Sequence, residues 1–228
     1  MESNYWYLQN VDVSGIFCPD KMTSQTEKHS EKIFKKGAFI YMPEDHSDTI
    51  YFLVRGRVKI GVMGESDKEI IKAILGKGEV FGEMALITDE SRKEFAVAME
   101  ETEVCIIHKK DIGSLLRERN AIHNFFLKLF GSRILETENR LESLVFKDSR
   151  SRIVEFLIEL TEKKGERVGF EMVVRKFLTH QEIANITATS RQTVTTVLND
   201  LRSRDIIKFD RRRLLIRNKE QLLAELSN

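Results

Sequence analysis

The stretch from Leu178 to Ile207 constrains the fold of this chain more than any other. It opens with residues 179–182, Thr-His-Gln-Glu, the pattern of a capping box, in which Thr179 caps the third backbone amide and Glu182 reaches back. A second helix is predicted from about Arg191, capped by Ser190 or by the residue before it, after a turn over residues 187–189. The stretch therefore predicts a helix, a tight turn and a second helix.

Both predicted helices have one apolar face. Ile183, Ala184 and Ile186 give the first helix its buried side, and the second is expected to bury Val194, Val197, Leu198 and Leu201. The outward residues of the second helix are Arg191, Gln192, Thr195, Thr196 and Asn199. These residue types suit the edges of base pairs, since Arg pairs with guanine, Gln with adenine, and Thr with either edge or a thymine methyl. The polar face is thus a candidate DNA-reading surface.

A predicted hairpin follows the second helix. Residues 206–209 and 214–216 are strand-like, and the tip between them is Asp210, Arg211, Arg212 and Arg213. A basic hairpin beside a recognition helix is placed to contact DNA phosphates. Each residue taken alone could simply face solvent, but two capped helices, a polar face and an arginine-rich hairpin together favour DNA.

Charge is distributed unevenly along the chain. The net charge of +1 combines 16 Lys/Arg and 11 Asp/Glu from Ser149 onward, net +5, with a net −4 before it. A basic C-terminal third on a slightly acidic body indicates a nucleic-acid-binding module attached to another domain. The 41% hydrophobic and 32% charged residues are ordinary for a globular protein.

Cysteine and histidine usage argues against metal centres. Cys18 and Cys105 are far apart, so neither an iron–sulfur cluster nor a structural zinc site is expected, and Cys105, inside an apolar run, is predicted to be a buried free thiol. The five histidines form no ligand pair, and no nucleophile–base pair of an enzyme is evident. No apolar run is long enough to span a membrane and the N-terminus lacks a signal-peptide pattern, so the expected location is cytoplasmic.

Between residues 31 and 108 the chain has short β-type runs separated by turn residues, which predicts an antiparallel roll or barrel. Gly56 is expected at a turn or bulge. Near the end of this region Gly82 opens a single helical turn, followed by Glu83 and, nine residues later, Arg92. Backbone amides and an arginine at this point could hold an anion such as a phosphate, whereas the alternative is a turn glycine and a structural Glu83–Arg92 salt bridge.

The segment after Asp111 is helical in pattern. Apolar or small residues alternate by four and three at Phe130, Ile134, Thr137, Leu141 and Leu144. This spacing is typical of a two-stranded coiled coil and predicts a parallel homodimer.

Two motifs resemble the CRP/FNR family of transcription regulators. They are THQEIA…SRQTVT over residues 179–195 and KGEVFGEMALI over residues 77–87, the latter followed by Arg92, an Ala-containing strand and TEV. The resemblance implies an α+β fold in three parts: an antiparallel β-roll (double-stranded β-helix) sensor domain over 1–117, a dimerisation helix over 118–147 and a winged helix-turn-helix domain over 148–228.

The resemblance also implies roles for individual residues. The base-reading positions are Arg191, Gln192 and Thr196, and the phosphate contacts are Thr179, Gln181, Ser190 and Thr193, joined by Arg211, Arg212 and Arg213 of the hairpin. Family members commonly have Glu and Arg where this chain has Gln192 and Thr196, so their usual half-site is not expected here.

The effector-binding positions implied by the resemblance are Gly82, Glu83, Arg92, Lys93 and Thr137. Lys93 is bulkier than the family's usual residue, and Glu94 and Glu138 are anions that the family pattern lacks. A cyclic nucleotide, another ligand or no ligand all stay open.

The sequence thus predicts a homodimeric, sequence-specific DNA-binding transcription regulator that binds a palindromic operator with half-sites about one DNA turn apart. RNA polymerase is a partner by family analogy, and no membrane partner is expected. The alternative from another class is a cyclic-nucleotide-binding sensor whose C-terminal module contacts a protein instead of DNA.

Overall fold

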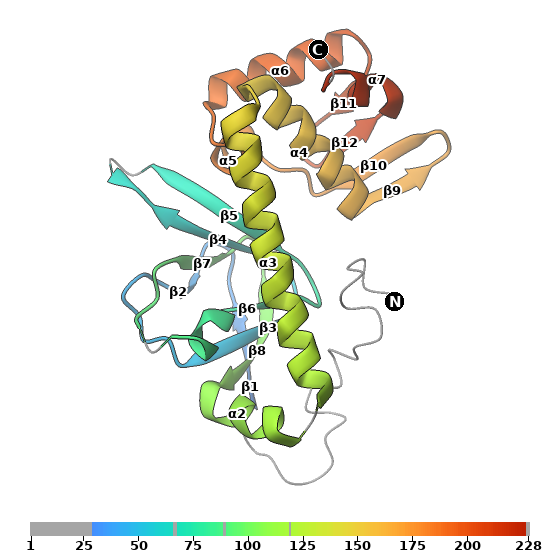
Figure 1. Cartoon of the computed structure of the whole chain (residues 1–228). Coiled ribbons are helices and arrows are strands. Elements are labelled where there is room, and N and C mark those ends of the chain that lie inside the picture. Colours follow the sequence, from blue (N-terminus) through green and yellow to red (C-terminus); the bar gives the residue numbers. More distant parts are fainter. Residues whose placement is uncertain (1–28, 66–67, 89, 119, 227–228) are drawn as a thin grey trace. The chain divides into compact units, whose positions relative to one another are not determined.

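A computed structural model describes residues 29–65, 68–88, 90–118 and 120–226 (Figure 1). The chain divides into two compact units, residues 1–134 and 135–228, with the division inside the long helix α3 (Asn120–Phe146). Cys18 lies outside the described residues. The two units are described separately.

The first unit contains two four-stranded antiparallel sheets, as predicted for a roll. One sheet has the order β1-β8-β3-β6 and the other β2-β7-β4-β5. The strands are β1 (His29–Phe34), β2 (Phe39–Tyr41), β3 (Thr49–Arg55), β4 (Val58–Met63), β5 (Glu69–Leu75), β6 (Val80–Phe81), β7 (Phe95–Ala98) and β8 (Thr102–His108).

Strand β3 is buried on both faces because successive side chains point to opposite sides of the sheet. Tyr51 and Leu53 join the core between the two sheets, while Ile50 and Phe52 join a second core. Cys105 lies in the second core as a buried free thiol, which confirms its prediction.

The second core packs the first sheet against helices. It receives Ile112 from α2 (Lys109–Glu118) and Ile122, Phe125, Phe126 and Leu129 from the first part of α3. Gly56, at the β3–β4 turn, has φ 95°, and an added Cβ would lie 2.5 Å from Thr102 Oγ1. The prediction of a turn glycine is confirmed, and any larger residue there would clash.

The second unit is a set of helices on a four-stranded antiparallel sheet of order β11-β12-β10-β9. Asp148 caps the helix that follows α3, accepting from Ser151 N at 2.7 Å. The elements are α4 (Ser149–Lys164), β9 (Gly165–Val168), β10 (Glu171–Arg175), α5 (His180–Thr187), α6 (Arg191–Ser203), β11 (Ile207–Phe209), β12 (Arg213–Ile216) and α7 (Lys219–Ala224).

The domain limits predicted from the sequence lie after residues 117 and 147. The division into two units, after residue 134, and the ends of the helices do not test these limits, so they remain predictions. No helix in the described ranges is both long and apolar enough to cross a membrane.

Candidate nucleic-acid interface

The capping box predicted at the start of α5 is present. Glu182 N donates to Thr179 Oγ1 at 3.2 Å, and Thr179 N donates to Glu182 Oε2 at 2.7 Å. Ile183 and Ala184 are fully buried as predicted, but Ile186 is only partly buried.

The turn between α5 and α6 is made by Ala188, whose φ of 50° is left-handed. Ser190 then caps α6 and accepts from Thr193 N at 3.0 Å, which resolves the choice between it and its neighbour. The predicted inner face of α6 is buried, at Val194, Val197, Leu198 and Leu201.

The opposite face of α6 carries the three predicted base-reading residues. Arg191, Gln192 and Thr196 are all exposed, and none has a side-chain hydrogen bond or ion pair with another described residue. Their donors and acceptors are therefore available to an external partner. Thr195 differs, because its hydroxyl donates to Arg191 O at 2.9 Å and lies 2.8 Å from His180 Nδ1.

The predicted phosphate contacts lie at the N-terminal ends of α5 and α6. Ser190 Oγ and Thr193 Oγ1 are 2.8 Å apart, and Gln181 Nε2 donates to Asn185 Oδ1 at 2.8 Å. Backbone N–H groups at helix N-termini favour anions, so the predicted phosphate contacts lie where helix geometry favours them.

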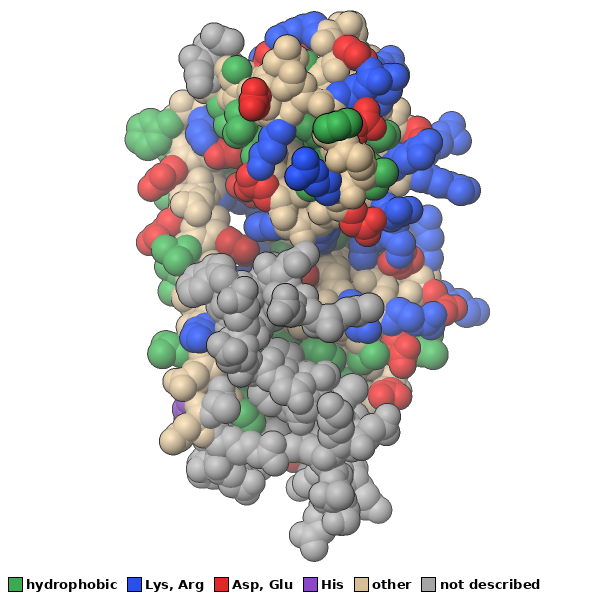
Figure 2. All heavy atoms as spheres, turned by 90° about the vertical axis from the view of Figure 1, so that its right-hand side faces the viewer, with side chains coloured by type: hydrophobic (Ala, Val, Ile, Leu, Met, Phe, Trp, Pro, Cys, Tyr) green, Lys and Arg blue, Asp and Glu red, His purple; other side chains and the backbone are tan. Residues whose placement is uncertain are grey.

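The predicted hairpin is the pair β11–β12, whose tip is fixed by Asp210. Its carboxylate accepts from Arg212 N at 2.7 Å and from Arg213 Nε at 3.0 Å. Arg213 is thereby paired, whereas Arg211 and Arg212 are exposed without a side-chain partner among the described residues. Figure 2 shows Lys and Arg side chains gathered along one edge of the face that it presents.

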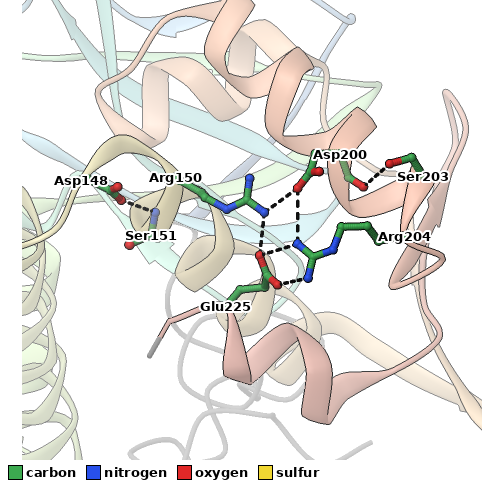
Figure 3. Close-up of polar contacts among 7 residues, drawn as sticks. All are labelled: Asp148, Arg150, Ser151, Asp200, Ser203, Arg204 and Glu225. Atoms are coloured by element: carbon green, nitrogen blue, oxygen red, sulfur yellow. Dashed lines mark hydrogen bonds and ion pairs between the residues drawn. The ribbon is translucent and has the colours of Figure 1, made fainter. Parts of the chain in front are cut away.

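A cluster of four charges joins three helices of this unit (Figure 3). Glu225, with a side chain 7% exposed, accepts from Arg150 Nη2 at 2.6 Å and binds Arg204 with both oxygens. Asp200 accepts from Arg150 Nη2 at 2.5 Å and lies 3.5 Å from Arg204 Nη1. Hydrogen bonds from the two arginines lower the pKa of Glu225 to about 2. The cluster ties the C-terminal end of α6 to α4 and α7.

Neither this cluster nor the His180–Thr195 contact was predicted from the sequence, because their members lie far apart in the chain.

In the first unit, Arg92 is buried and bonded to the roll itself. Its Nη1 donates to Gly82 O at 3.1 Å, its Nη2 donates to Thr49 O, and its guanidinium lies 4.4 Å from the centre of the Tyr41 ring. Gly82 has φ 74° at the start of the short helix η4 (Glu83–Leu86), and a Cβ there would lie 2.8 Å from Arg92 Nη1. The structure thus brings Gly82 and Arg92 together.

Glu83 does not form the salt bridge with Arg92 that was one alternative. It pairs instead with Arg133 Nε at 3.5 Å, and burial raises the pKa of its carboxyl. Glu94 accepts from Tyr41 Oη at 3.2 Å and from Lys72 Nζ at 3.0 Å. Burial and the charge of Glu94 raise the pKa of Tyr41.

The other predicted effector residues are exposed. Lys93 pairs with Glu90 at 2.5 Å, and Thr137 lies on α3 beyond the unit division. No group of three or more His, Cys, Asp or Glu in the described part of the chain is arranged to hold a metal ion.

The residues predicted at the dimer interface lie along α3. Ile134, Leu141 and Leu144 are 59%, 62% and 43% exposed, whereas Phe130 is partly buried against the second core. Four further exposed apolar residues of this helix were not predicted, and these are Leu127, Leu135, Val145 and Phe146.

Comparisons with known proteins bear on both units. The family model for the cyclic nucleotide-binding domain matches residues 31–119, and that for the Crp-like helix-turn-helix domain matches residues 151–225. The global nitrogen regulator of Synechococcus elongatus is 33% identical over 85% of this chain and 88% of its own length. A CRP-like cAMP-activated global transcriptional regulator of Mycobacterium tuberculosis is 27% identical over 92% and 95%.

The chain belongs to the CRP/FNR family. It is a DNA-binding transcription regulator, and contact with a protein in place of DNA is not favoured. Its family is one of regulators and not of enzymes.

Solved structures agree with this assignment. A CRP-family transcriptional regulator from Thermus thermophilus matches with a TM-score of 0.70 and 26% identity, over 86% of this chain and 97% of that one. A CooA mutant from Carboxydothermus hydrogenoformans, at 24% identity, shares the fold with a TM-score of 0.80 over 94% and 95%. CRP-family regulators with this helix-turn-helix bind DNA and typically dimerise.

Proposed function

We propose that this CRP/FNR regulator acts as a homodimer in the cytoplasm, where each protomer places α6 in the major groove of one half of a palindromic operator. The observation that carries the proposal is the face of α6 on which Arg191, Gln192 and Thr196 are exposed and have no intramolecular partner among the described residues. Polar side chains left free on a helix with a buried opposite face are suited to base edges.

Phosphate contacts are proposed to set the position of α6 on the duplex. Thr179, Gln181, Ser190 and Thr193 supply side chains at two helix N-termini, and the hairpin tip supplies Arg211, Arg212 and Arg213. Such contacts give affinity and register without sequence preference. We propose RNA polymerase as the further partner, by family analogy.

The test is selection of bound duplexes from a random DNA pool by the full-length protein, followed by affinity measurements on single-base variants of the selected site. Arg191→Ala is expected to cost about 1–3 kcal/mol at one base position in each half-site and to relax the preference there, because the bidentate pair with one base is lost. Equal weakening on every sequence would refute the base-reading role of Arg191.

Arg202→Ala is the matched control. Arg202 lies near the other end of α6, where its Nη2 donates to Asn199 Oδ1 at 2.9 Å and its guanidinium lies 5.0 Å from the centre of the Phe209 ring. Its loss is expected to leave the order of preferred bases unchanged.

For the roll we propose that a cyclic nucleotide is not the effector. Arg92 is already bonded to two backbone carbonyls of the roll and lies against Tyr41, while its buried Nε has no hydrogen-bond partner among the described residues. A phosphate would therefore compete with bonds that this arginine makes within the roll. Glu83 and Glu94 add two carboxylates close enough that Glu94 raises the pKa of Glu83. A third anion beside them would be repelled.

Calorimetric titration with cyclic AMP and cyclic GMP is therefore expected to give no binding heat at micromolar concentrations. Micromolar affinity that Arg92→Ala abolishes would contradict the proposal and return Arg92 to the role of a phosphate ligand.

A further inference from the structure

His180 lies where α5, α6 and the β11–β12 hairpin meet. It is the first residue of α5, its Nδ1 lies 2.8 Å from Thr195 Oγ1 of α6, and its ring stands edge-on to Phe209 of β11 with centroids 5.7 Å apart.

The hydrogen bonds fix which ring nitrogen of neutral His180 carries the proton. Thr195 Oγ1 donates its hydrogen to Arg191 O at 2.9 Å, so its oxygen accepts from His180 Nδ1–H. Nε2 of the neutral ring is then an acceptor, and it has no partner among the described residues. Such a ring cannot donate to a phosphate until Nε2 is protonated.

Burial and a neighbouring positive charge both favour the neutral form of the His180 ring in the free protein. Burial and then the positive charge of Arg191 on α6 lower the pKa of His180. On the hairpin side, Phe209 has Arg202 over its ring, and on α5 itself Glu182 is held in the capping box with Thr179. Among the described residues, no carboxylate facing His180 raises its pKa.

The residues beside His180 belong to the proposed DNA contact. Thr179 and Gln181 flank it in the chain, and the positive charge of Arg191 on α6 is near enough to lower its pKa. We infer that His180 is a further DNA contact: in the complex its protonated ring donates from Nε2 to a phosphate oxygen, so each bound protomer takes up one proton. This inference rests on the proposed docking of α5 and α6 on DNA.

The sign of the pH effect follows from linkage. A nearby phosphate favours the charged ring, so the complex binds more protons than the free protein. Affinity therefore rises as pH falls, by up to about tenfold per pH unit for each bound protomer, and levels off below the pKa of the free protein.

The sequence makes this effect traceable to one side chain. The histidines of the chain are at positions 29, 46, 108, 123 and 180, so His180 is the only one in residues 135–228, which also contain no Cys or Tyr. It is thus the only side chain of this unit whose ordinary pKa lies near neutral pH.

The experiment measures the affinity of the full-length protein for one selected duplex from about pH 5.5 to pH 8.5 at constant salt, a range that spans the titration of histidine. The wild type is expected to bind more weakly as pH rises. His180→Gln should remove this slope, and His180→Lys, a fixed positive charge, should bind independently of pH and more tightly than the wild type at the alkaline end.

His46→Gln, at an exposed position of the roll, is the matched control and should keep the wild-type slope. A wild type without a slope, or a His180→Gln variant that retains it, overturns the inference while leaving DNA binding intact. Failure to select any duplex at any pH would count against the proposed function instead. Thermal melting of each variant checks that the fold is kept.

Discussion

Leu141→Glu is expected to convert the protein into a monomer. Its affinity for a palindromic site should then fall by about a hundredfold or more, because the two DNA-binding units that contact the half-sites are no longer linked in one dimer. Leu141 lies in the C-terminal half of the apolar stripe of α3 and is 62% exposed. In a two-stranded coiled coil it would face its own copy, so the substitution places two carboxylates in an apolar seam.

Sedimentation velocity gives the oligomeric state and fluorescence anisotropy gives the affinity. Glu142→Ala, one residue further along and off the predicted stripe, should stay dimeric and bind as the wild type does. A Leu141→Glu protein that sediments as a dimer and keeps its operator affinity would show that α3 is not the dimer contact.

The exposed apolar stripe on α3 is longer than the sequence pattern predicted. The four-and-three spacing selected Ile134, Leu141 and Leu144, all of which are exposed on α3. The prediction did not include Leu127, which lies three residues before Phe130, continues the same spacing and is 73% exposed. A heptad pattern finds residues that repeat, but it cannot tell an apolar side chain that packs inside the protomer from one that does not.

Local signals predicted the DNA-binding unit best. The capping box at Thr179, the cap of α6 and the buried face of α6 each depend on residues a few positions apart. All three were found, with Ser190 as the cap out of the two residues that the sequence allowed. Such features are set by helix geometry, so the sequence alone carries them.

Contacts between distant residues could not be predicted. Glu83 takes Arg133 as its partner and not Arg92, and Arg92 bonds to Thr49 and Gly82. Both choices depend on how strands and α3 fold onto one another. The resemblance placed Gly82, Glu83 and Arg92 in one pocket. It could not predict that Arg92 makes its hydrogen bonds within the roll.

The cluster around Glu225 is another contact between distant residues, and Glu225→Ala is expected to lower the free energy of unfolding of the C-terminal unit by about 2–3 kcal/mol at neutral pH. The substitution leaves Arg150 and Arg204 with only Asp200 to compensate them. A drop in pKa from 4.5 to about 2 corresponds to roughly 3 kcal/mol of stabilisation of the folded state. The two arginines are 35% and 48% exposed, so solvent screening reduces this figure.

The pH dependence separates this effect from a loss of packing. Because the pKa of folded Glu225 is depressed, its contribution is fully present above about pH 4.5 and disappears as pH falls through about 2. Urea titrations at about pH 7 and about pH 2, with unfolding followed in α6 by hydrogen–deuterium exchange, should therefore show a large difference from the wild type at the first pH and a small one at the second. Glu220→Ala, on the same helix at an exposed position, should match the wild type at both. An equal loss of unfolding free energy at the two pH values would mean that Glu225 stabilises the fold through packing. Its ion pairs with Arg150 and Arg204 would then contribute nothing to stability.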